Sequence, residues 1–157
     1  FKVDDKKSLG PDLIAGCVAA VNDFGGPLIV VDLGTATTMI VINKQKEMIG
    51  GCIIPGMKIS LDALCKRAAL LSEINLEDVG NIIGKNTVDC MKSGLIYGTV
   101  AMIEGLCEKI EEELGYSCKV IITGGLNSII APYFKRKVII KENLLLDGLR
   151  IIYSKLK

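Results

Sequence analysis

The chain has 157 residues, of which half are hydrophobic, and it carries 19 basic against 18 acidic side chains. This length suits one domain with a buried core, and a net charge of +1 excludes the basic surface that nucleic acid or an anionic membrane requires. The apolar runs are far shorter than the roughly 20 residues of a membrane span, and no basic segment precedes a signal-like stretch, so we expect a soluble protein.

The first third of the chain predicts a helix followed by three strands. Apolar side chains recur at helical spacing over residues 11–24, with Pro11 and Asp12 in the first turn, and two glycines follow. Buried strands are predicted at residues 27–32, 37–44 and 47–56. The polar residues 43–47 form a hairpin turn between the last two, so we expect three successive antiparallel strands.

The rest of the chain predicts alternating helices and strands. Helices are expected at residues 58–71, 86–115, 125–134 and 143–156, and strands at residues 119–123 and 137–141. Three meandering strands followed by this alternation are typical of a ribonuclease H-like α/β domain, a mixed sheet with helices on both faces. The charged, irregular lead-in after Phe1 favours the interpretation that residues 1–157 are the later domain of a longer polypeptide.

The cysteines argue against a metal cluster and for a reducing compartment. No C-x-x-C pair and no histidine is present to complete a zinc site. Four cysteines fall within helical patterns, and we expect them to be small buried thiols in a cytoplasmic protein: Cys17, Cys65, Cys90 and Cys107. Because histidine is absent, any acid–base chemistry falls to carboxylates or lysines.

The stretch "IVVDLGTATTMIVI", residues 29–42, places a polar bend between two apolar strands. Gly34 would let a phosphate approach the backbone, and Thr35, Thr37 and Thr38 would add hydroxyl donors. Asp32, at the end of the strand, would hold a cation that bridges the phosphates. An ordinary tight hairpin explains the same residues, and the D-x-G-T pattern alone does not decide between the two interpretations.

Further glycine-rich turns end apolar elements elsewhere in the chain. They are "GGCIIPG" at 50–56, "IIGKNT" at 82–87, "SGLIYG" at 93–98 and "ITGG" at 122–125. Each one alone is explained by a helix cap or close packing, but together they predict one site. The glycine pair Gly124 and Gly125, after a buried strand and opening a helix, suits the adenosine end of a nucleotide.

Several of these stretches occur together in one known family. "GGPLIVVDLGTATT", "GGCIIPGMKISLDAL", "IGKNTVDCMKSGLIYG", "ITGGL" and "LLLDGLRIIY" have the order and approximate spacing found in type III pantothenate kinases, the Bvg accessory factor-like proteins. This family belongs to the actin-like ATPase superfamily of acetate and sugar kinases, heat-shock chaperones and actin. The chain resembles the family over nearly its whole length. Members carry an additional N-terminal ribonuclease H-like domain with a D-x-G-N-T phosphate loop, and no such loop occurs in these 157 residues.

The resemblance implies ATP-dependent phosphorylation of pantothenate, the first committed step toward coenzyme A, with active sites near a homodimer interface. On the acceptor side, Asp12 matches the family's general base, and Thr87 matches a substrate contact. The substrate loop corresponds to Gly10, Pro11, Asp12 and Leu13. The family commonly has G-x-D-R here, and Leu13 replaces the arginine. A helix N-terminal acid is the alternative explanation for Asp12.

On the nucleotide side, the resemblance implies ATP with Mg²⁺ and a monovalent cation, either potassium or ammonium. Asp32 matches the monovalent-cation ligand, and Thr35 matches the contact to the ATP phosphates. Gly34 belongs to the same phosphate loop, and Gly124 and Gly125 complete the predicted ATP site. The expected partners are therefore ATP, pantothenate, the N-terminal domain and a second copy of the chain, without nucleic acid or membrane.

Two alternatives remain beside the kinase. A non-catalytic accessory or regulatory protein would keep the fold without turnover, and Leu13 together with the absent N-terminal loop is the feature that separates it from a kinase. An apolar oligomerisation domain would explain the core but not the spaced turns. The segment 86–114 has apolar residues on more than one face, including Leu95, Ile96, Val100, Met102, Ile103 and Leu106. They indicate either a dimer surface or a fully buried helix.

Overall fold

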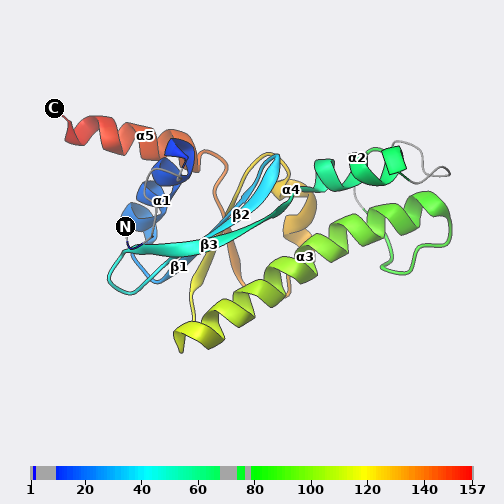
Figure 1. The fold of residues 1–157 in the computed structure, drawn as a ribbon, viewed down its shortest axis with the longest axis horizontal. Coiled ribbons are helices and arrows are strands. Elements are labelled where there is room, and N and C mark those ends of the chain that lie inside the picture. The colour runs from blue at the N-terminus through cyan, green and yellow to red at the C-terminus, as the bar shows by residue number, and fades with distance from the viewer. Residues whose placement is uncertain (1, 3–9, 68–73, 77–78, 157) are drawn as a thin grey trace.

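A computed structural model describes residues 2, 10–67, 74–76 and 79–156. A five-stranded sheet with the order β3-β2-β1-β4-β5 forms the centre of the fold. Strands β3, β2 and β1 pair antiparallel, whereas β1, β4 and β5 pair parallel, so the sheet is mixed as predicted. In Figure 1, helices α1 and α5 lie together at one side of this sheet, and the long helix α3 lies at the other.

The first elements form close to their predicted bounds. They are α1 (Pro11–Phe24), β1 (Leu28–Leu33), β2 (Ala36–Ile42) and β3 (Met48–Pro55). The proline at the start of α1 loses nothing by lacking an N–H there, and Gly25, with φ of 73°, ends the helix. In the β2–β3 turn, the Asn43 side chain accepts hydrogen bonds from the backbone N–H groups of Gln45 and Glu47, each at 2.9 Å. This turn fixes the hairpin that the polar segment predicted.

The later elements are α2 (Met57–Arg67), α3 (Thr87–Leu114), β4 (Lys119–Thr123), α4 (Asn127–Ile130), the 3₁₀ helix η2 (Ala131–Tyr133), β5 (Val138–Ile140) and α5 (Leu144–Lys155). Residues 68–71 of the predicted helix 58–71 lie outside the described part of the chain, as does most of the predicted lead-in. The prediction of one helix at 125–134 is wrong. Pro132 has no N–H to donate back along a helix, and the chain forms α4 followed by a 3₁₀ turn instead.

The alternation of side chains along the strands divides the core into two layers. Ile29, Val31 and Leu33 of β1 pack on the α3 side of the sheet. Leu28 and Val30 point the opposite way and pack with α1 and α5. Both faces of the sheet are therefore covered by helices, as expected for the predicted fold.

Helices α1 and α5 cross at very short distance. Gly148 of α5 lies against the backbone of Ala15 in α1, so a Cβ at Gly148 would overlap the Ala15 carbonyl oxygen. Next to this crossing, a Cβ on Gly16 would lie 3.8 Å from Leu144. Small residues on both helices therefore set how closely α5 approaches the face of the sheet that carries the candidate site.

Helix α3 is buried along most of its apolar length. The Asn86 side chain accepts a hydrogen bond from the Asp89 backbone N–H at 2.9 Å, and Gly115 ends the helix in the left-handed conformation. Of the six apolar residues considered for a dimer surface, Leu95, Ile96, Val100 and Ile103 are buried within the chain and Met102 and Leu106 are half-buried. Four of the six residues are therefore covered within the chain, which favours the buried-helix interpretation for them, and the homodimer stays a prediction.

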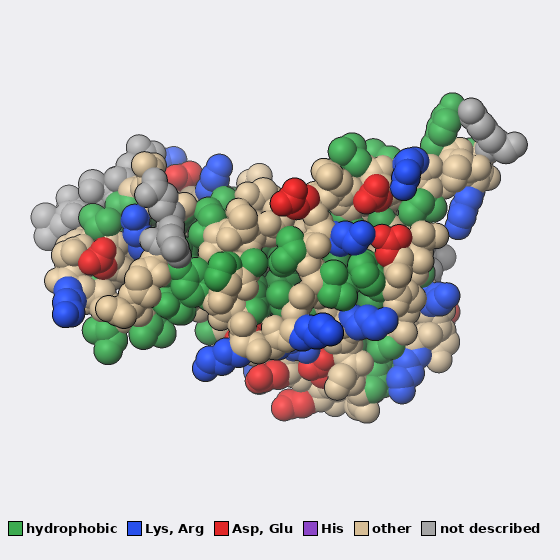
Figure 2. Space-filling view, turned by 180° about the vertical axis from the view of Figure 1, so that it is seen from behind, with side chains coloured by type: hydrophobic (Ala, Val, Ile, Leu, Met, Phe, Trp, Pro, Cys, Tyr) green, Lys and Arg blue, Asp and Glu red, His purple; other side chains and the backbone are tan. Residues whose placement is uncertain are grey.

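The predictions of buried cysteines and of a surface without a basic patch can be compared with the structure. Cys17 and Cys107 are buried as expected, but Cys90 is exposed, because it lies in the first turn of α3 beyond the edge of the sheet. On the face in Figure 2, acidic and basic side chains of the described residues are interspersed. No helix within the described ranges is long and apolar enough to pass through a membrane.

Candidate active site

Three polar side chains form a row across the middle of the sheet. Asp32 of β1 lies opposite Thr38 of β2 in the antiparallel register and opposite Thr123 of β4 in the parallel register. Each of them is two positions along its strand from an apolar side chain that packs beneath α1, namely Val30 for Asp32, Ile40 for Thr38 and Ile121 for Thr123. All three polar side chains therefore point to the same side as α1, just where the apolar core ends.

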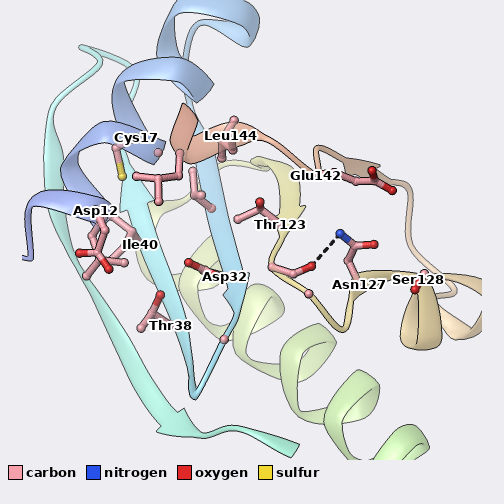
Figure 3. A pocket seen from close by; sticks show the side chains of 17 residues that line it. Asp12, Cys17, Asp32, Thr38, Ile40, Thr123, Asn127, Ser128, Glu142 and Leu144 are labelled. Atoms are coloured by element: carbon pink, nitrogen blue, oxygen red, sulfur yellow. Dashed lines mark hydrogen bonds between the residues drawn. The ribbon is translucent and has the colours of Figure 1, made fainter. Parts of the chain in front are cut away.

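This row forms the floor of a cavity of about 490 Å³. Asp12 and Leu13 at the start of α1 form one wall, and the turn at Gly124 and Gly125 forms another. Figure 3 shows Asp12 and Thr38 on one side of Asp32, and Thr123 and Asn127 on the other. The cavity therefore has a side that belongs to α1 and β2 and a side that belongs to the turn after β4.

The turn after β4 has no room for a side chain at Gly124. Gly124 has φ of 98°, a conformation that residues with a Cβ rarely adopt. A Cβ there would lie 2.6 Å from the backbone N and O of Leu33 and 2.7 Å from Oδ1 of Asp32. The Asn127 side chain fixes the turn, because its amide nitrogen donates to the Gly124 carbonyl oxygen at 2.8 Å (Figure 3). The glycine thus lets the β4 turn lie directly against the Asp32 carboxylate.

The predicted phosphate loop between β1 and β2 packs closely against Gly56, directly after β3. A Cβ at Gly56 would overlap the Thr35 carbonyl oxygen and lie 2.7 Å from that of Gly34. The stretch "GGCIIPG" therefore serves close packing against the loop rather than direct contact with a ligand. Gly34 lines the cavity, whereas Thr35 is exposed beside it.

The cavity holds three carboxylates, Asp12, Asp32 and Glu142, and the first two lie on facing elements. Burial raises the pKa of Asp32 above its ordinary value, and the nearby charge of Asp12 raises it further. Within the described residues, Asp32 forms no hydrogen bond or salt bridge that would offset this cost. Cys17 also lines the cavity, but burial raises its pKa to about 12, so its thiol is neutral and a poor nucleophile. The chemistry available here therefore rests on the carboxylates.

The threonines of β2 divide between the two faces of the sheet. Thr38 lines the cavity, and its Oγ1 atom is buried without a hydrogen-bond partner. Thr37, its neighbour, is only 1% exposed and alternates to the α3 side. The expectation that Thr37 adds a donor to the site is therefore wrong, because successive side chains of a strand point in opposite directions.

The structure brings together six of the ten predicted site residues: Asp12, Leu13, Asp32, Gly34, Gly124 and Gly125 all line the cavity. Gly10, Pro11 and Thr35 adjoin it in sequence without lining it. Gly10 caps α1, and a Cβ there would overlap the Asp12 carboxylate, so this glycine makes room for the side chain beside it.

Thr87 does not join the cavity within this chain. It lies at the start of α3, which covers the opposite face of the sheet from α1. The segments 82–87 and 93–98 lie there as well, and Lys85 lines a separate cavity with Asp89 and Lys92. Within the described part of one protomer, 122–125 is the one glycine-rich segment of the four that lines the cavity, so a single site made by all four stays a prediction.

Four polar residues of the cavity were not predicted as site residues: Thr123, Asn127, Ser128 and Glu142. Thr123 ends a buried strand directly before the glycine pair, and that position was a usable signal. Asn127, Ser128 and Glu142 follow no pattern in the sequence, because the fold of the segment after β4 alone places them at the cavity.

Comparison with known proteins identifies the family. A sequence profile for type III pantothenate kinase matches residues 1–109. The chain belongs to the type III pantothenate kinase family. Curated relatives of that name include a Roseiflexus sp. (strain RS-1) protein, 45% identical over 154 residues, and a Geobacillus sp. (strain WCH70) protein, 44% identical over 155 residues. These alignments cover 98% and 99% of this chain but 60% of each relative, so the chain spans about 60% of their length.

Solved structures confirm the fold. A Baf family protein from Campylobacter jejuni, described as a transcriptional activator, superposes with a TM-score of 0.73 at 24% identity, covering 99% of this chain and 68% of that one. Component A of the (R)-2-hydroxyglutaryl-CoA dehydratase from Acidaminococcus fermentans gives 0.51 at 12% identity, covering 87% and 64%. This member of the type III pantothenate kinase family therefore shares the fold of these structures, a mixed sheet with helices on both faces, as predicted.

Proposed function

We propose that this chain is the C-terminal domain of a cytoplasmic, two-domain kinase that transfers the γ-phosphoryl group of ATP to pantothenate, the first step toward coenzyme A. The observation that carries the proposal is the pair of carboxylates, Asp12 and Asp32, facing one cavity beside a glycine turn. A bond forms between the alcohol oxygen and phosphorus, the bond to the bridging oxygen of ADP breaks, and the alcohol proton passes to Asp12.

The two sides of the cavity suit the two substrates. Gly125 has open space around it on the β4 side, where the flat base and sugar of a nucleotide can approach the backbone. Asp12 lies on the other side, where it can accept the proton of an alcohol. The strand order places Asp32 between them, so transfer would take place above β1.

Asp32 is a suitable ligand for a cation. Its carboxylate is half-buried, its pKa is raised by burial and by Asp12, and no basic side chain neutralises it among the described residues. Oxygen ligands of this kind suit Mg²⁺ and monovalent cations, with phosphate oxygens and water completing the shell. When bound, potassium or ammonium with Mg²⁺ would neutralise phosphate charge, while Asp32 keeps the cation beside β1.

Leu13 leaves the pantothenate carboxylate without the expected arginine. Its side chain lines the cavity and packs on the α1-side core, so it offers an apolar contact only. Lys85 lies at the start of α3 beside a separate cavity, and it does not replace the arginine within one protomer. We therefore propose that a homodimer partner supplies the groups that meet the carboxylate, with Thr87 among the candidates.

A kinase assay on the full-length protein tests the function. We expect phosphorylation of pantothenate in the presence of ATP and Mg²⁺, and its loss in Asp12→Asn, which controls for contaminating enzyme. Pantothenol, which lacks the carboxylate, serves as the second acceptor. A preference for pantothenate that Lys85→Ala abolishes would show that this lysine acts from the partner, whereas equal use of both acceptors would show that carboxylate recognition is lost.

A non-catalytic accessory protein is the second candidate function, and the substitution at Leu13 is the observation that favours it. Such a protein would bind nucleotide at the β4 turn without transferring phosphate. Nucleotide binding by the full-length protein, without phosphorylation of pantothenate or pantothenol, would replace the kinase proposal with this one.

A further inference from the structure

One hydroxyl group in the cavity has no hydrogen-bond partner. Oγ1 of Thr38 is the one buried side-chain nitrogen or oxygen atom, within the described ranges, that lacks one. Burying a donor without an acceptor is costly, and such groups are rare in folded proteins. A rotation of the Thr38 side chain that opens Oγ1 to the cavity would let a ligand oxygen accept this hydrogen bond.

The position of Thr38 indicates which part of a ligand meets it. Thr38 lies directly opposite Asp32 and on the same side of it as Asp12 (Figure 3). A nucleotide that sits at the Gly124 and Gly125 turn reaches the Thr123 side of the row first. If the base and sugar lie at that turn, the terminal phosphoryl group is the part of ATP that would extend farthest across β1 toward β2 and Thr38.

We propose that the Thr38 hydroxyl donates a hydrogen bond to a non-bridging oxygen of the γ-phosphoryl group. The inference rests on the proposed function in placing the nucleotide at the β4 turn. The hydroxyl forms no covalent bond and transfers no proton. It binds the phosphoryl group before transfer and stabilises the charge on its oxygens while the group moves toward the side of Asp12.

Three variants of the full-length protein separate the hydroxyl from the side-chain shape. Thr38→Val keeps the shape and removes the hydroxyl, and Thr38→Ser keeps the hydroxyl. Thr37→Val is the matched control, because the neighbouring side chain points to the opposite face of the sheet. Calorimetry measures the affinities for ADP and for the non-hydrolysable ATP analogue AMPPNP, and steady-state kinetics measures kcat and KM.

Thr38→Val should reduce the preference for AMPPNP over ADP by about tenfold, with the ADP affinity unchanged. It should lower kcat by about 10- to 100-fold and change KM for pantothenate by less than about threefold. Thr38→Ser should restore both values to within about threefold of wild type, and Thr37→Val should leave them unchanged. The Tm of ligand-free Thr38→Val should equal or exceed that of wild type, since the variant removes an unsatisfied donor.

Each outcome decides the inference separately from the proposed function. An unchanged AMPPNP-to-ADP ratio in Thr38→Val overturns the inference, even if wild type phosphorylates pantothenate. A reduced ratio with no kinase activity in wild type supports the role of Thr38 and overturns the function. A lower Tm in Thr38→Val shows that the hydroxyl has an internal partner, and it overturns the inference, as does a wild-type protein that binds neither nucleotide.

Discussion

Asp12 and Asp32 face the same cavity but differ in what surrounds them. Asp12 begins a helix at the edge of the cavity, whereas Asp32 lies half-buried on the central strand between two threonines. We expect Asp12→Asn to lower kcat by at least about a hundredfold, because the amide cannot accept the alcohol proton. Nucleotide affinity, measured by calorimetry, should be nearly unchanged, since a lost base need not disturb the ground state.

Asp32→Asn should act on the nucleotide instead. Without the carboxylate, the cation beside the phosphates loses its protein ligand, so we expect a roughly tenfold weaker affinity for ATP. Activation by potassium or ammonium should be blunted in the same variant. Titrations of ATP at several potassium concentrations measure both effects. Equal losses of ATP affinity in Asp12→Asn and Asp32→Asn would contradict the separate roles.

The Asp32 carboxylate should also cost the ligand-free protein stability. Because burial and Asp12 raise its pKa in the folded state, the unfolded chain releases this proton at lower pH than the folded chain does. Stability from this group is highest below the ordinary pKa of 3.8 and falls as pH rises through the raised pKa. Asp32→Asn removes the effect, so its advantage in Tm over wild type should grow from acid to neutral pH. A constant difference across that range would contradict the assignment.

The residues that sequence reasoning could find are those at the ends of apolar strands. Asp32 and Gly34 follow a buried run, and Gly124 and Gly125 follow another, so a polar or flexible residue there needed a reason. The burial of Cys90 was mispredicted, because helical periodicity does not tell where a helix extends beyond the sheet. Whether the Thr38 hydroxyl finds a hydrogen-bond partner depends on how β2 lies relative to β1 and α1. No local sequence pattern predicts that arrangement.

At the scale of elements, the crossing of α1 and α5 controls one wall of the cavity. We expect Gly148→Ala to destabilise the fold by about 3 kcal/mol or more, because its methyl group would overlap the Ala15 carbonyl and push the helices apart. Chemical denaturation of the 157-residue chain measures this change. Ligand affinity should fall as well, since Asp12 and Leu13 move with α1.

Gly98→Ala is the matched control for this variant. It also adds a methyl group to a helical glycine, but a Cβ at Gly98 has nothing within 4 Å. It should therefore stabilise the chain by about 0.5–1 kcal/mol, the ordinary gain of alanine over glycine within a helix. A similar loss of stability in both variants would show that helix propensity, and not the close crossing, governs position 148.

The helices and strands were predictable because their apolar residues recur at regular helical or strand spacing. Residues 86–115 repeat at helical spacing between an asparagine cap and a glycine, and α3 follows with bounds Thr87–Leu114. The side on which each helix packs was not predictable from its own sequence. The role of Thr87 came from the family resemblance instead, and within one protomer Thr87 lies at the start of α3, on the opposite face of the sheet from the cavity.

At the scale of the whole molecule, the chain spans about 60% of the length of its curated relatives. We expect the 157 residues alone to bind nucleotide weakly and to show no phosphorylation of pantothenate. Phosphoryl transfer requires both ends of the transferred group to be held, and the cavity of this domain holds it from one side. A kinase assay on the isolated chain, with Asp12→Asn as the control for contamination, measures this. Robust turnover would contradict it.

The same scale includes the proposed homodimer. Although most of α3 is buried, exposed apolar side chains remain around its start, namely Ile82, Ile83 and Val88. Burying them in a second copy would also bring Thr87 and Lys85 to an interface. We expect the full-length protein to sediment as a dimer at micromolar concentration, and Ile83→Lys to shift it toward the monomer. A wild-type monomer would refute the proposal.

The parallel pairing of β1 with β4 has a consequence for biosynthesis. Asp32 and Thr123 are neighbours in the sheet, yet the hairpin strands, α2 and the whole of α3 separate them along the polypeptide. On the ribosome, the α1 side of the cavity can form early, but its opposite wall is missing until β4 has emerged and closed a long loop. Capture of nucleotide by a nascent chain would therefore mark the moment when β4 has paired with β1, and ATP in the cell would favour that pairing by mass action.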